Sequence, residues 1–77
     1  MNKTEQEERI IETMLKACST REECKKWIAH EIQVSYTKAE NMRTMQNLRA
    51  VRLYYKDIST FSRLRFYIDE LTHHLPD

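Results

Sequence analysis

The chain contains no glycine, and its one proline, Pro76, is the penultimate of 77 residues. Glycine is the residue that most readily takes the positive φ angles of tight turns and β-hairpins. A strand-rich fold needs several such turns, so the absence of glycine argues for helices joined by short polar connections. The sequence therefore predicts an all-α fold, with residues 1–77 forming one domain, a compact bundle of four short helices.

Three helix starts are marked by a threonine followed three residues later by a glutamate, at Thr4, Thr20 and Thr37. In this capping box the threonine oxygen accepts the amide of the glutamate residue, whose side chain reaches back to the cap. Apolar residues at helical spacing follow each start, and Asp57-Ile58-Ser59-Thr60 supplies a fourth cap. We predict helices at about 5–18, 21–33, 38–56 and 60–74.

The break between the second and third helices depends on the third capping box. Nothing in Gln33-Val34-Ser35-Tyr36 forbids a helical backbone. One unbroken helix from 21 to 56 is therefore the alternative.

Charge and hydropathy exclude several classes of protein. The net charge is only +1, although residues 41–68 hold six Arg or Lys against Asp57 alone. The first nine residues are nearly all polar, and no apolar run approaches the ~18 residues of a membrane span. We expect a cytoplasmic protein without a membrane partner, in which Cys18 and Cys24 are reduced.

Catalytic and metal-binding patterns are missing from the sequence. Cys18, Cys24 and His30 are spaced six apart, which places them on different sides of a helix and is not a zinc spacing. The two cysteines are predicted to be small buried residues, and His73-His74 to be a solvated helix cap. With no paired nucleophile and base and no phosphate-binding glycine loop, we expect no enzyme activity, no cofactor, no metal and no small-molecule substrate.

Residues 25–42 fit the spacing of a helix-turn-helix, whose two helices share a small apolar core. Counted from Lys25, the inward positions hold Ile28, Ala29, Ile32, Val34, Ala39 and Met42, and Ser35 follows in the turn. This stretch resembles the DNA-binding domains of LuxR-type response regulators, which often have Ile-Ala-x-x-Leu-x-Ile-Ser at this place.

The resemblance implies a dimer that binds duplex DNA through residues 37–52, with a dimer face on the fourth helix at Phe61, Leu64, Ile68 and Leu71. Side chains at and after the start of the predicted helix 38–56 would contact bases and phosphates. These are Thr37, Lys38, Asn41, Arg43, Thr44, Arg49 and Arg52. Glu40 near the start of that helix and the near-neutral charge favour a different function.

That different function is protein binding. The predicted helix 38–56 carries apolar residues around most of its circumference, which is typical of a helix that contacts another chain. Phe66 also points away from the stripe of its own helix. We predict a non-enzymatic adaptor, inhibitor or modulator, of the small kind common in phages and mobile elements, that binds another protein or forms a homodimer. Its interface residues are predicted to be Tyr54, Tyr55, Phe66, Tyr67, Arg52 and Arg63.

Overall fold

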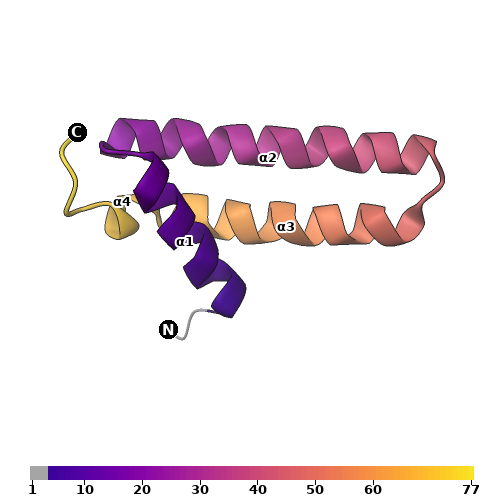
Figure 1. Ribbon diagram of the computed structural model, residues 1–77, viewed down its shortest axis with the longest axis horizontal. Coiled ribbons are helices and arrows are strands. Elements are labelled where there is room, and N and C mark those ends of the chain that lie inside the picture. Colours follow the sequence, from indigo (N-terminus) through magenta and orange to yellow (C-terminus); the bar gives the residue numbers. More distant parts are fainter. Residues whose placement is uncertain (1–3) are drawn as a thin grey trace.

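The computed structural model describes residues 4–77, which form four helices and no strand. They are α1 (Glu5–Ala17), α2 (Arg21–Thr44), α3 (Leu48–Phe66) and α4 (Ile68–Leu71). Helices α2 and α3 lie side by side as a long hairpin, α1 crosses this hairpin near its open end, and α4 follows α3 there (Figure 1). The molecule extends over 43 × 25 × 18 Å. The all-α class with four helices is confirmed.

The first two capping boxes define the starts of α1 and α2 as predicted. Thr4 Oγ1 accepts the amide of Glu7 at 3.1 Å, and Thr20 Oγ1 accepts the amide of Glu23 at 3.1 Å. The carboxylate of Glu23 in turn accepts the amide of Ser19 at 3.0 Å. Each threonine satisfies an amide that has no acceptor inside the helix, while the Glu7 carboxylate pairs with Arg63 at 3.0 Å.

The predicted break between residues 33 and 38 is wrong in its position. Helix α2 passes unbroken through this stretch, and the Thr37 hydroxyl donates to the carbonyl of Gln33 at 3.1 Å instead of capping a new helix. The unbroken alternative from 21 to 56 is also wrong, because the chain turns at 45–47. There Gln46 takes a positive φ of 60° and the Asn47 side chain caps α3 by accepting the Ala50 amide at 3.2 Å.

The predicted break at 57–59 and the helix 60–74 are wrong as well. Helix α3 continues to Phe66, and α4 is a single turn at 68–71. The groups expected to cap have other partners. The Thr60 hydroxyl donates to the carbonyl of Lys56 at 3.1 Å, and Asp57 accepts the side-chain amide of Gln6 at 3.0 Å.

The apolar core lies at the open end of the hairpin, where the helices meet. Buried Met14, Cys18, Cys24 and Ile68 pack with Leu15, Trp27 and Leu75. The stripe proposed as a dimer face belongs to this end and faces inward. Leu64 and Ile68 are buried, and Phe61 contacts Trp27 edge-on at 6.3 Å between ring centroids. These side chains stabilise the monomer and do not form an exposed face.

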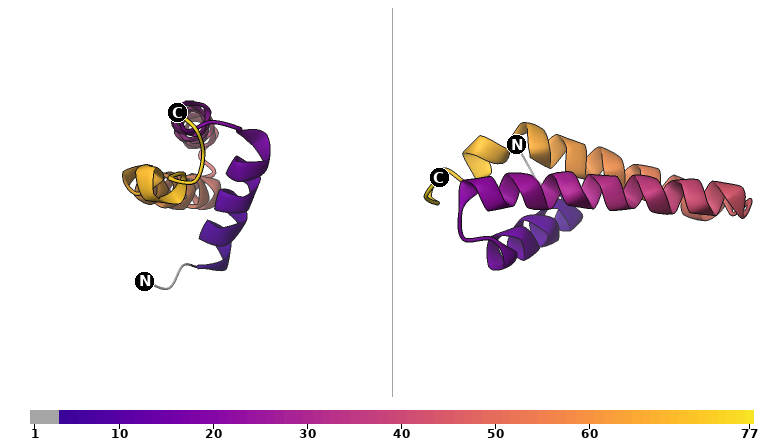
Figure 2. Two further views of the ribbon diagram at one scale, coloured as in Figure 1. Left: turned by 90° about the vertical axis from the view of Figure 1, so that its left-hand side faces the viewer. Right: turned by 90° about the horizontal axis from the view of Figure 1, so that it is seen from above.

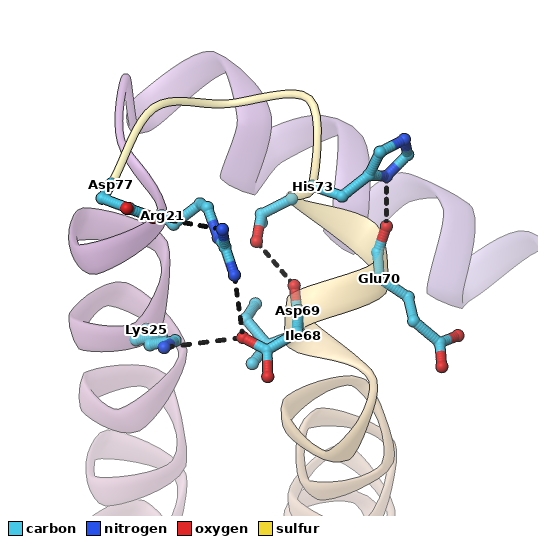
Figure 3. Close-up of polar contacts among 8 residues, drawn as sticks. Arg21, Lys25, Ile68, Asp69, Glu70, His73 and Asp77 are labelled. Carbon is cyan, nitrogen blue, oxygen red and sulfur yellow. Dashed lines mark hydrogen bonds and ion pairs between the residues drawn. The ribbon is translucent and has the colours of Figure 1, made fainter.

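Ion pairs hold the C-terminal residues against the start of α2 (Figure 3). Arg21 pairs with Asp77 at 3.1 Å and with Asp69 at 3.5 Å, and Lys25 also pairs with Asp69 at 3.5 Å. The Arg21 amide is one of the first amides of α2, which have no acceptor within the helix, and it donates to the carbonyl of Pro76 at 2.8 Å. The end of the chain therefore completes the first turn of α2.

Candidate protein-binding surface

The half of the hairpin that includes its turn is built from α2 and α3 alone. We call residues 36–56 the distal half; α1 and α4 pack at the other end (Figures 1 and 2). Close to the boundary, small Ser35 and Ala39 are buried. No residue from 40 to 57 is buried. The apolar side chains of this half therefore lack the cover that a third helix gives to the open end.

Large apolar side chains are exposed in the distal half. They account for five of the six exposed large apolar residues in the described part of the chain. Leu48 is 71% exposed, Met45 70%, Leu53 59%, Tyr36 49% and Tyr55 37%. Single exposed apolar residues are ordinary on protein surfaces, whereas a concentration of them is typical of an interaction site.

A chain of side-chain contacts joins α2 to α3 across the distal half. The rings of Tyr36 and Tyr55 meet edge-on at 6.3 Å between centroids. Arg43 Nη2 donates to the Tyr55 hydroxyl at 2.7 Å, and Arg43 Nη1 pairs with Glu40 at 3.2 Å. Arg43, predicted to contact phosphates, is thus already engaged within the chain.

The exposed side of α3 combines apolar and basic side chains. Leu48, Arg49, Val51 and Arg52 line an open depression of about 590 Å³. Residues 48–56 carry three basic side chains and no acidic one, a local charge of +3. Within residues 4–77 none of these three, Arg49, Arg52 and Lys56, forms an ion pair. Their positive charge is therefore available to a partner.

The structure divides the predicted protein-interface residues between the two ends of the molecule. Arg52, Tyr54 and Tyr55 lie in the distal half, where Tyr54 is half-buried. The other three lie toward the open end. Arg63 pairs with Glu7 of α1 at 3.0 Å, while the exposed Phe66 contacts Tyr67 edge-on at 5.2 Å.

The predicted DNA-binding residues are also in the distal half, but the turn at 45–47 divides them between the end of α2 and the start of α3. Thr37, Lys38, Asn41 and Thr44 are exposed on the second half of α2. The Thr44 hydroxyl donates to the carbonyl of Glu40 at 3.1 Å. The turn that the helix-turn-helix motif requires is absent between residues 33 and 38, and DNA binding through these residues stays a prediction.

Four exposed side chains were not among the residues predicted to form an interface: Tyr36, Met45, Leu48 and Leu53. Met45 and Leu48 were expected inside one helix, 38–56, because the turn was predicted about ten residues too early. The signal that could have found them is Asn47, a good N-cap residue directly before Leu48.

The two cysteines lie where α1 meets α2 and, as predicted, are buried with free thiols. The pKa of the Cys24 thiol is raised from 9.0 to about 11, mainly by burial and to a smaller extent by the neighbouring Cys18. A thiol that stays protonated at neutral pH is a poor nucleophile and metal ligand.

No protein-family model, curated protein or solved structure matches the chain. Residues 4–77 contain no group of three His, Cys, Asp or Glu side chains placed to hold a metal ion. None of the helices in these residues is long and apolar enough to cross a membrane.

Proposed function

We propose that the chain is a small, non-enzymatic regulatory protein that acts by binding a protein partner through the distal half of its hairpin. One observation carries this proposal. Leu48, Met45 and Leu53 are largely exposed, and none of the residues from 40 to 57, which comprise the end of α2, the turn and the first part of α3, is buried.

The driving force for such binding is the burial of apolar surface. Complete burial of a leucine or methionine side chain contributes about 1.5–3 kcal/mol. The distal half therefore offers several kcal/mol to a partner that covers it. Rim residues such as Arg52 and Tyr55 supply the polar and aromatic contacts that frequently dominate protein interfaces.

Site-specific photo-crosslinking tests the proposal. A benzophenone amino acid replaces Leu48 in one variant and Glu8, which is exposed on α1 at the other end of the molecule, in the control. Both are expressed in the cells that normally produce the protein. We expect discrete protein adducts from position 48 and none from position 8.

The products also separate the alternatives. An adduct at twice the mass of the chain would identify the partner as a second copy, consistent with the predicted homodimer. Adducts to nucleic acid alone, or no adduct from position 48, would contradict the proposal.

A further inference from the structure

We infer that the partner presents an acidic amphipathic helix, which lies on the exposed face of α3 over residues 48–56. This inference rests on the proposed protein-binding function and adds the chemistry of the partner. It is drawn from the way in which α1 docks on the same hairpin.

Helix α1 is itself an amphipathic helix that covers one part of the hairpin. Its Met14 is buried in the core, and its acidic Glu7 is almost fully buried against α3. Glu7 pairs with Arg63 at 3.0 Å, and next to this pair Gln6 donates to Asp57 at 3.0 Å. Helix α1 therefore docks on the hairpin through apolar contacts at the open end together with a carboxylate that pairs with an arginine of α3.

The hairpin is longer than α1 can cover. At about 1.5 Å per residue, the 13 residues of α1 span about 20 Å and the 24 residues of α2 about 36 Å. Helix α1 also crosses the hairpin at an angle near the open end, so the distal half has no third helix (Figure 2). A partner helix would extend the layer that α1 begins.

The basic side chains of α3 repeat the contact that α1 uses. Arg49, Arg52, Lys56 and Arg63 follow one another at spacings of three, four and seven residues, which places them along one face of the helix. Arg63 forms an ion pair with Glu7 of α1, whereas the other three basic side chains have no acidic partner in residues 4–77. Glutamate or aspartate side chains on the incoming helix would pair with them.

Charge also decides against two other occupants. A symmetric dimer through this face would bring Arg49 and Arg52 of both copies into one interface, where like charges repel. Nucleic acid would pair with the arginines but would leave Leu48 and Leu53 uncovered, because phosphates offer no apolar surface. An acidic amphipathic helix satisfies both kinds of side chain.

Two matched peptides test the inference with the full chain. Each is a fluorescent helix of about 18 residues, or five turns, with leucines along one stripe. Glutamates flank the stripe in one peptide, and lysines replace them in the other. By fluorescence anisotropy we expect the acidic peptide to bind at least about tenfold more tightly, because each exchange turns an attraction at the rim into a repulsion. Added salt should reduce this preference.

Variants of the chain test whether the peptide binds on α3. The double variant R49E/R52E should reverse the preference, whereas R65E, a charge reversal on α3 near the opposite end, should retain it. Leu48→Ser combined with Leu53→Ser should weaken binding of the acidic peptide by about tenfold through lost apolar burial. Circular dichroism of each variant verifies that the helices are intact.

Equal binding of the two peptides, binding of neither, or an unchanged preference in R49E/R52E would overturn the inference. The proposed function would survive each of these results if position 48 crosslinks to a protein. Loss of those protein adducts would overturn both.

Discussion

Proline at position 38 tests whether α2 runs unbroken through the middle of the hairpin. Lys38 is exposed and lies in the interior of α2, so its replacement removes a helical hydrogen bond and introduces a clash with the preceding turn. Leu48 is the matched position, because it is exposed and is the first residue of α3 after the Asn47 cap. Proline is favoured at a first helical position, whose amide has no acceptor in the helix.

The expected difference between the two variants is large for a chain of this size. At 0.05–0.15 kcal/mol per residue, the free energy of unfolding of the 77-residue chain is roughly 4–12 kcal/mol. Proline in the interior of a helix costs about 3 kcal/mol or more, so Lys38→Pro removes a quarter or more of it. The melting temperature should then fall by roughly 12–24 °C. Leu48→Pro should stay within about 1 kcal/mol of the parent chain.

Thermal and urea unfolding followed by far-ultraviolet circular dichroism measure both variants. If Lys38→Pro does not fold, the glycine variants of positions 38 and 46 repeat the comparison with a smaller perturbation. Glycine at 38 should cost up to about 1 kcal/mol, while glycine at 46 should be neutral or stabilising, because Gln46 has φ 60°. A stable Lys38→Pro with a strongly destabilised Leu48→Pro would refute the continuous α2. It would place the turn before residue 38, as in the helix-turn-helix hypothesis.

Two further predictions concern the open end of the hairpin. Arg63→Ala leaves the buried Glu7 carboxylate without its ion-pair partner. Urea unfolding should show a loss of about 1–2 kcal/mol in the free energy of unfolding, whereas Arg65→Ala should show almost none. Equal effects of the two substitutions would contradict this role of the pair. The pKa of Cys24 is raised from 9.0 to about 11, so the folded state favours the neutral thiol. The resulting contribution to the free energy of unfolding is complete below about pH 9 and is lost as the pH rises toward 11. The loss amounts to about 3 kcal/mol, because each pKa unit corresponds to about 1.4 kcal/mol. Cys24→Ala should flatten the pH dependence of stability in this range, and parallel curves for the two proteins would count against the buried, neutral thiol.

The starts of α1 and α2 could be predicted because a capping box is a local signal. At Thr4 and Thr20 the hydroxyl accepts the expected amide. Thr37 belongs to the same sequence pattern, yet its hydroxyl donates to the carbonyl of Gln33 inside α2. Ser35 and Ala39, on either side of Thr37 in the sequence, are buried, and their burial favours the continuous helix. Tertiary packing of this kind is not encoded in a local motif.

The same error explains why the sequence located only part of the candidate surface. Apolar residues on most sides of the stretch 38–56 were interpreted as one unusual helix, and Arg52, Tyr54 and Tyr55 were predicted from it. The stretch is in fact the end of α2, a turn and the start of α3. Leu48, expected in the interior of a helix, therefore lies in the first turn of α3 and is exposed beside Arg49 and Arg52.

The position of the turn determines what the molecule can bind. With a turn before residue 38, the arginines of residues 49–52 would belong to the middle of a helix. With the turn at 45–47, α2 and α3 extend well past α1, and the excess length carries Leu48, Leu53 and the unpaired Arg49 and Arg52. The pair between Glu7 and Arg63 shows, within the same chain, how a docked helix uses this face of α3. The length of the hairpin relative to α1 is therefore the feature that makes room for a partner helix.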